Sequence, residues 1–176
     1  MRTDIVAVLA LAAASAILLA EPAQTDARLQ AQLRQLFPKA ASFSTKGGEP
    51  PHIKALDAQK AITGYAFWTT ELEPLERGYD GPIKILVGLN PGGVLTGVVV
   101  AEHNEPYGNF SIDLPRFAEQ FRGKSLRDPF RVGADIHAVS RATMTVSSAA
   151  RAVRNSARRV ARQLLTPPAV ASPAGY

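Results

Sequence analysis

The chain has 176 residues, a length that fits one compact domain with short appendages and excludes a second full domain. It contains no cysteine, which excludes disulfides, thiolate metal sites and cysteine nucleophiles, so redox chemistry would have to come from a bound cofactor. Hydrophobic residues make up 46% and charged residues 20%, as in globular proteins, and the net charge of +5 allows an anionic partner without identifying one.

The first 22 residues have the features of a signal peptide or an uncleaved membrane anchor. Arg2 precedes an uncharged apolar run over residues 5–20, which as a helix would reach only about 24 Å and is short for a membrane span. A positive start, an apolar middle and small residues at the end are typical of export signals. We therefore expect the rest of the chain in the periplasm or on the outer face of the cytoplasmic membrane, away from nucleic acid.

The exported part begins with a helix and then a sheet. Three leucines at helical spacing, followed by a proline, predict an amphipathic helix over residues 26–37. Glycine and proline predict a loop over residues 44–51. Strand-forming residues are crowded between residues 62 and 70, including two threonines at the end, and they predict the first strand.

A β-hairpin follows. Residues 83–89 and 94–101 read as strands, and the turn residues 90–93 between them are Asn, Pro, Gly and Gly. Three consecutive valines at 98–100 predict that helices cover this strand on both faces.

Two further helices are predicted, over residues 114–121 and 146–165. The second has an apolar stripe and an opposite face of five arginines, which we interpret as a solvated surface. The proline-broken residues 166–176 read as a flexible tail. Together these elements predict one α+β domain over residues 26–165, with a twisted, mainly antiparallel sheet flanked by helices.

Five hydroxyl residues lie between positions 140 and 148, at the start of the last helix. Serine and threonine at a helix start often cap the first free N–H groups. The same helix end attracts a phosphate, because its free N–H groups and partial positive charge favour anions. Composition alone leaves both interpretations open.

The segment Ser140-Arg141-Ala142-Thr143 resembles the S/T-G-A-T motif of the FMN-binding domain. That domain occurs in the G subunit of Rnf electron transport complexes, the C subunit of the sodium-translocating NADH:quinone oxidoreductase, and the exported part of nitrous-oxide-reductase regulatory flavoproteins. The resemblance covers roughly residues 26–163. It implies that Thr143 carries FMN through a phosphoester bond that a dedicated flavin transferase installs.

The resemblance also implies the remaining cofactor contacts. Residues near the phosphate would come from the motif, and residues along the isoalloxazine would come from the segment after the hairpin. The implied cofactor-binding residues are Thr143, Ser140, Arg141, Ala142, Thr145, Glu105, Tyr107 and Gly108. No catalytic residue and no metal site is predicted.

Two positions differ from the family pattern. Arg141 stands where the family usually has glycine, and it would either crowd the transferase or reach the FMN phosphate. His137 stands where the family favours aspartate, and Asp135 lies two residues earlier. Covalent attachment is therefore a separate question from FMN binding.

The resulting hypothesis is an exported FMN-dependent electron carrier whose partner is a membrane electron-transport complex or an exported reductase. A carrier is favoured over a complete enzyme, because no second redox centre and no acid/base pair is visible in the sequence. The alternative is a cofactor-free assembly or regulatory subunit of a membrane redox complex. A basic protein bound to a membrane surface is a third interpretation.

Overall fold

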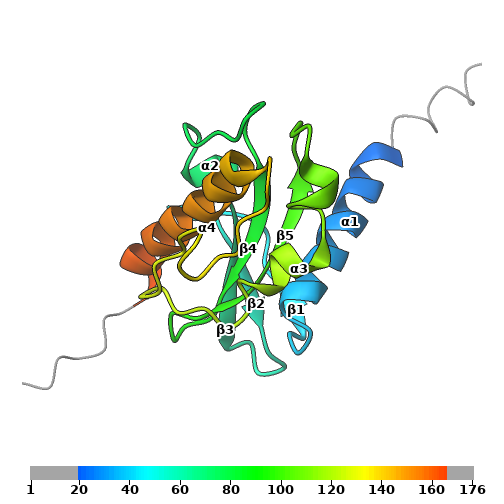
Figure 1. The fold of residues 1–176 in the computed structure, drawn as a ribbon. Helices are drawn as coiled ribbons and strands as arrows, with labels where there is room; N and C mark the ends of the chain where they lie inside the picture. Colours follow the sequence, from blue (N-terminus) through cyan, green and yellow to red (C-terminus); the bar gives the residue numbers. More distant parts are fainter. Residues whose placement is uncertain (1–19, 166–176) are drawn as a thin grey trace, which may run out of the picture.

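In the computed structural model, which describes residues 20–165, a five-stranded antiparallel sheet has helices on both faces (Figure 1). The strands lie in chain order, each antiparallel to the next. They are β1 (Ser42–Phe43), β2 (Ile53–Leu56), β3 (Ile62–Trp68), β4 (Lys84–Leu89) and β5 (Leu95–Glu102). The helices are α1 (Ala20–Leu36), α2 (Thr69–Leu72), the short 3-10 helix η1 (Gly108–Phe110), α3 (Pro115–Glu119) and α4 (Thr143–Leu164). The predicted α+β class is confirmed.

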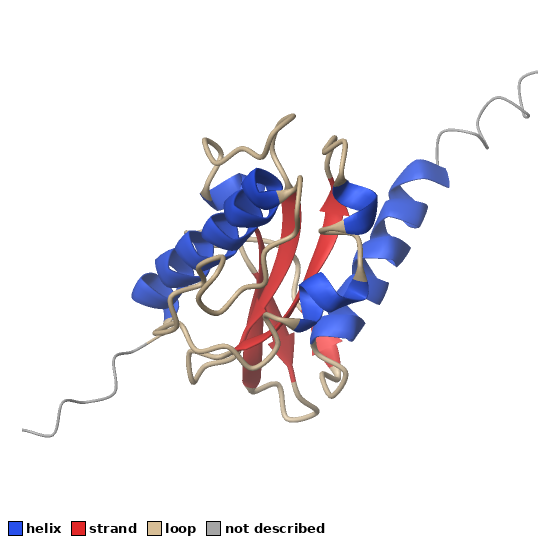
Figure 2. Cartoon of the chain, viewed as in Figure 1, coloured by secondary structure: helices blue, strands red, loops and turns tan. Residues whose placement is uncertain are grey.

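The sheet separates two hydrophobic cores, as the layers in Figure 2 show. On one face α2, α3 and α4 cover the sheet, and the aromatic side chains of Phe117, Phe121 and Phe130 pack among the valines and alanines of α4. On the other face α1 lies against β4 and β5, and its Leu33 and Leu36 belong to the second core. Burial of apolar surface in these two layers is the main stabilising term of the fold.

The predicted hairpin is present as β4 and β5. The side chain of Asn90 accepts the Val94 N–H at 3.0 Å, and Gly93 has a φ of +75°, a conformation that glycine adopts without steric cost. Val98 faces the core that contains α4, whereas Val99 packs against the core that contains α1. The expectation of helical cover on both faces of this strand is confirmed.

Both edges of the sheet are short or covered. β1 has only two residues. At β5 the backbone of Leu95 pairs with the carbonyl of Lys124 and the N–H of Gly123, and Arg28 donates to the Ala101 carbonyl.

Several element boundaries differ from the sequence prediction. α1 begins at Ala20 rather than residue 26, and α3 ends at Glu119 rather than residue 121. The predicted first strand stops at Trp68, because the hydroxyl of Thr69 donates to the Ile83 carbonyl and accepts the Ile85 N–H at 3.0 Å each, which holds the chain in α2. The strands β1 and β2 were not predicted, since each is too short for a clear alternation of side chains.

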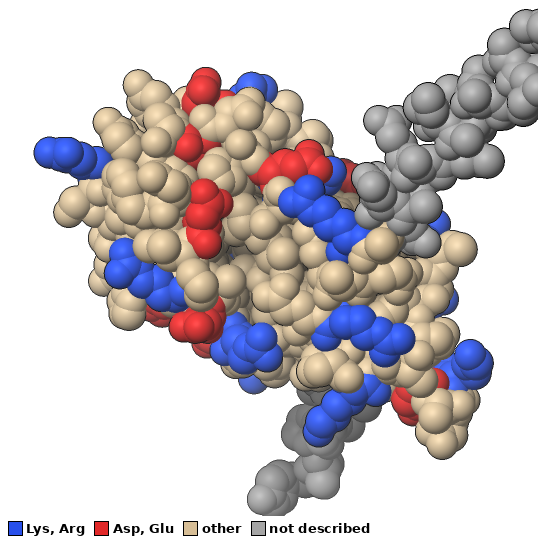
Figure 3. Space-filling view, turned by 90° about the vertical axis from the view of Figure 1, so that its right-hand side faces the viewer, with Lys and Arg blue, Asp and Glu red and all other residues tan. Residues whose placement is uncertain are grey.

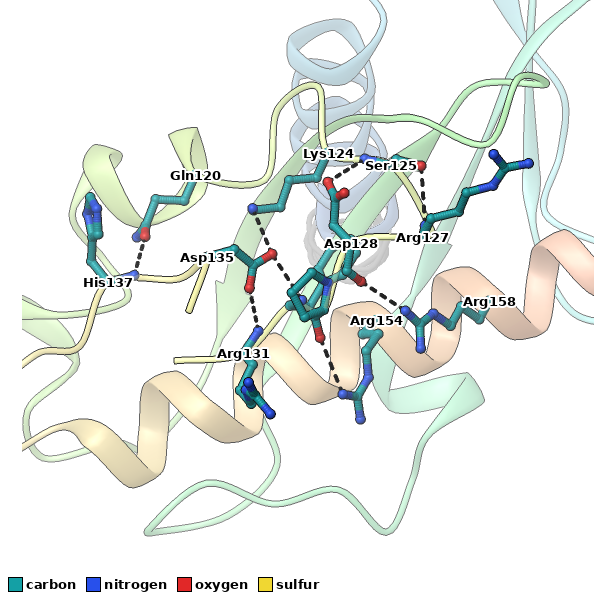
Figure 4. Close-up of polar contacts among 12 residues, drawn as sticks. Gln120, Lys124, Ser125, Arg127, Asp128, Arg131, Asp135, His137, Arg154 and Arg158 are labelled. Carbon is teal, nitrogen blue, oxygen red and sulfur yellow. Dashed lines mark hydrogen bonds and ion pairs between the residues drawn. The ribbon is translucent and has the colours of Figure 1, made fainter. Parts of the chain in front are cut away.

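The arginine face of α4 is solvated only in part: Arg151 and Arg162 are exposed, and the other three arginines are half-buried. Four of its arginines bond to neighbouring loops or to the end of α2: Arg151 to the Glu76 carboxylate, Arg154 to the Pro129 carbonyl, Arg158 to the carbonyls of Leu126 and Asp128, and Arg159 to the Leu72 carbonyl. Figure 4 shows Arg154 and Arg158 reaching the loop above them. These bonds fix the loops around the side of α4.

The predicted signal or anchor falls largely on residues 1–19, and the predicted tail is residues 166–176; both lie outside the described residues. Within residues 20–165, no helix combines the length and the apolar character needed to cross a membrane.

Candidate functional site

The start of α4 is open to solvent and lacks a side-chain cap. α4 begins at Thr143, and the residue before it, Ala142, has no side chain that can accept a hydrogen bond. Thr143 is exposed, and its hydroxyl donates weakly to the Val139 carbonyl at 3.4 Å. The capping interpretation of these hydroxyls is therefore wrong, and the first turn keeps N–H groups and a partial positive charge free for an anion. The helix thus begins three residues before the predicted start at residue 146 and includes residues 143–145.

Arg141 has a left-handed backbone. Its φ is +67°, a conformation that side chains with a β-carbon disfavour and glycine adopts freely. The glycine that the family pattern places here is explained by this geometry, because the chain must reverse sharply between Ser140 and α4. The Arg141 side chain is exposed and Ala142 beside it is buried, so the reversal leaves Thr143 at the surface.

Glu105 and Thr145 meet below this helix end. Glu105 is only 6% exposed, and its carboxylate accepts the N–H groups of Tyr79 at 3.0 Å and Asp80 at 2.9 Å together with the hydroxyl of Thr145. Burial raises the pKa of Glu105, but these three donors outweigh burial and hold the pKa below its ordinary value. The Thr145 hydroxyl is thus buried and already bonded, whereas that of Thr143 faces solvent.

Two glycines make room for this arrangement. A β-carbon on Gly78 would lie 2.3 Å from a Glu105 carboxylate oxygen, and one on Gly108 would lie 2.2 Å from the His103 ring. The His103 ring accepts the Glu105 N–H at 3.0 Å and contacts Asp113 at 2.7 Å. The space beside Gly108 is thus occupied by a protein side chain, that of His103. Within residues 20–165, no group of three His, Cys, Asp or Glu side chains is placed to hold a metal.

Tyr107 lies at the surface of the same segment. It is 42% exposed, and its ring centroid is 5.3 Å from that of Phe110, which is 37% exposed. Met144, in the first turn of α4, is 60% exposed. The structure therefore leaves exposed apolar side chains both on the segment after β5 and at the start of α4.

A cavity of about 340 Å³ adjoins the motif. It lies between η1, α3 and residues 137–140, and its lining is Ser111, Arg116, Phe117, Gln120, His137, Ala138, Val139 and Ser140. We call it the Arg116 cavity. Its wall ends at Val139 and Ser140, and the carbonyl of Val139 is the acceptor of the Thr143 hydroxyl. The cavity and the start of α4 are thus adjacent.

Asp135 holds the loop that leads to the motif. Its carboxylate accepts the N–H groups of Phe130 at 3.0 Å and Arg131 at 2.7 Å and pairs with Lys124 at 2.9 Å (Figure 4). Burial raises the pKa of Asp135, but the backbone N–H groups and Lys124 outweigh it, so the pKa is lower than usual. The Gln120 side chain accepts the His137 N–H at 2.6 Å. These bonds fix the path of the chain into Ser140.

Sequence reasoning missed Arg116 and Gln120 on and after α3, and the 78–81 loop that Glu105 binds. Their side chains lie far along the chain from the motif, and no local spacing signals their approach. Gly78 was the available clue, since glycine often marks a close contact.

Comparison with known proteins identifies the domain. Residues 78–158 match the family described as the FMN-binding domain. This segment of the chain, rather than the chain as a whole, is similar to the FMN-binding domain family. The match includes every predicted cofactor-binding residue, from Glu105 to Thr145.

Curated relatives match over a shorter stretch. The G subunit of the ion-translocating oxidoreductase complex of Haemophilus influenzae strain PittEE is 47% identical over 47 residues, which are 27% of this chain and 21% of that protein. The same protein of strain 86-028NP gives the same figures. The match thus spans about a fifth of the relatives' length. The crystal structure of Shewanella oneidensis NqrC is 22% identical, with a TM-score of 0.44 over 67% of this chain and 65% of that one.

Proposed function

We propose that the domain binds FMN at the start of α4 and serves as an electron carrier, with Thr143 as the residue that bonds to the FMN phosphate. The observation that carries this proposal is the exposed Thr143 hydroxyl on an uncapped helix end beside a cavity, within a segment similar to the FMN-binding domain family. The resemblance of residues 140–143 to the attachment motif supports the same residue.

The residues present fit this cofactor. A phosphate group needs hydrogen-bond donors and positive charge, which the first turn of α4 and Arg116 supply. The Arg116 cavity lies within the size range of small-molecule sites in proteins. Tyr107, on the segment after β5, and Met144, in the first turn of α4, offer exposed apolar surface. The Thr145 hydroxyl is buried against Glu105, so Thr143 is favoured over Thr145 as the attachment point.

When bound, a flavin accepts and releases electrons singly or in pairs, which suits a chain that has no cysteine of its own. The residues of the protein bind the cofactor and position its attachment site. Asp135 fixes the loop that leads to the motif, Glu105 fixes the 79–80 backbone against α4, and the left-handed Arg141 turns the chain so that Thr143 is accessible.

The partner in this proposal is a membrane electron-transport complex, or an exported reductase, on the outer side of the cytoplasmic membrane. The name of the Haemophilus relatives, which places them in an ion-translocating oxidoreductase complex, supports the membrane complex. The apolar, uncharged residues 5–20 behind Arg2 support export or anchoring. Fusion of alkaline phosphatase to the C-terminus tests this location, and an inactive fusion in cells would contradict it.

Co-expression with a flavin transferase tests the attachment. We expect the intact mass to exceed that of the polypeptide by one FMN unit and the flavin absorbance to survive denaturation. Thr143→Ala should remove the added mass, whereas Ser147→Ala, on the next turn of the same helix, should retain it. An adduct that persists in Thr143→Ala would show that FMN is bonded to another residue. Protein purified from its native host without any flavin absorbance would favour the cofactor-free subunit instead.

A further inference from the structure

The Arg116 cavity is rich in hydrogen-bond donors. Arg116 is exposed, and the ion pairs found among residues 20–165 leave its guanidinium free. The Gln120 oxygen is used by the His137 N–H, so its amide group remains as a donor. The hydroxyl of Ser140 and the imidazole of His137 lie in the same lining. Such a set of groups suits a ligand that only accepts hydrogen bonds.

No carboxylate lines this cavity, although acidic residues are near in the sequence. Asp113 contacts His103 at 2.7 Å, Asp135 is bonded to Lys124, and neither is in the lining. His137 occupies the position where the family pattern favours aspartate. The cavity therefore combines a cationic guanidinium with neutral donors, and it is electrostatically suited to an oxyanion.

The cavity also lies where a phosphate bonded to Thr143 would need support. Its wall is formed by Val139, whose carbonyl accepts the Thr143 hydroxyl, and by Ser140 at the start of the motif. The uncapped start of α4, which follows Ser140 in the chain, carries a partial positive charge. Figure 3 views the side of the molecule that carries α1 and α3 and shows Lys and Arg side chains spaced over its lower part.

We infer that Arg116, with His137 and Gln120 beside it, binds the phosphate of FMN non-covalently, so that the domain selects FMN over riboflavin even without a covalent bond. The inference rests on the proposed function and adds the residues of this chain that bind the phosphate. Arg116 is a binding residue for the phosphate, and its planar guanidinium suits two oxygens at once.

The test uses the full-length Thr143→Ala variant, in which no covalent bond to residue 143 can form. This variant is titrated with FMN and, separately, with riboflavin, and binding is followed by flavin fluorescence. Riboflavin has the same ring system and lacks the phosphate. We expect FMN to bind at least about ten-fold more tightly, as one charge-assisted contact would provide. Adding Arg116→Gln should weaken FMN about ten-fold and leave riboflavin unchanged. Adding Arg122→Gln, an exposed arginine outside the cavity lining, should change neither affinity.

Other outcomes separate this inference from the proposed function. Equal affinities for FMN and riboflavin would overturn the inference and leave the proposed function standing. A loss of both affinities in Arg116→Gln, with an unchanged thermal melt, would place Arg116 against the ring and would also overturn it. A domain that binds no free FMN but is loaded by the transferase would contradict this inference alone. A domain that neither binds FMN nor is loaded would contradict both proposals.

Discussion

Replacing Glu105 by glutamine should weaken the hydrogen bonds that hold the loop with Tyr79 and Asp80 in place. The carboxylate accepts two backbone N–H groups and one hydroxyl in a nearly buried position, and an amide offers only one oxygen. One backbone bond to a charged acceptor, worth about 1.5–3 kcal/mol, is then lost, and the other becomes an ordinary bond worth about 1 kcal/mol. We expect the free energy of unfolding to fall by about 3 kcal/mol at pH 7.

The dependence of this loss on pH follows from the lowered pKa of Glu105. A carboxyl whose pKa is lower in the folded state stabilises the protein above its unfolded pKa, which is about 4.3 for glutamate. That stabilisation is lost as the pH falls through the folded pKa, because the protonated acid then resembles glutamine. The difference between wild type and Glu105→Gln should therefore be constant above about pH 5 and shrink in more acidic solution.

Urea denaturation followed by the fluorescence of Trp68, the only tryptophan, measures both effects. Glu102→Gln is the matched control, since Glu102 is exposed and pairs only with Lys84 at the surface, and it should cost less than about 1 kcal/mol. The reasoning is refuted if Glu105→Gln costs no more than this control, or if its cost grows as the pH falls.

Four further substitutions test other parts of the structure. Arg141→Gly should raise the unfolding free energy by about 0.5–1 kcal/mol, because glycine adopts the left-handed conformation without strain; a lower melting temperature would contradict this. Thr96→Val should stabilise the protein by about 1 kcal/mol, since the buried Thr96 hydroxyl has no partner among residues 20–165. Thr69→Val should destabilise it by about 1–3 kcal/mol, because the Thr69 hydroxyl makes two hydrogen bonds. Similar urea midpoints for the two variants would refute this contrast. Gly78→Ala should destabilise by about 1–3 kcal/mol through the clash with Glu105, and a crystal structure with the carboxylate unmoved would show the clash to be absent.

Long periodic elements were predictable from the sequence, and contacts between distant residues were not. The β4–β5 hairpin has a turn signature and apolar strands, so its residues alone define it. The position of Thr143 at a helix start also followed from local sequence. By contrast, Glu105 contacts Thr145 forty residues away, and nothing in either segment encodes that distance. The exposed Thr143 and the buried Thr145 are two residues apart with the same chemistry, and only tertiary packing distinguishes them.

The edges of the sheet bear on how the protein behaves at high concentration. An open edge strand offers unpaired backbone groups to another copy and so invites aggregation. Here β1 gives a second molecule only two residues to pair with, while the backbone around Lys124 and the side chain of Arg28 occupy the outer side of β5. Deleting residues 123–126 would uncover that strand and turn a protected edge into one that templates self-association.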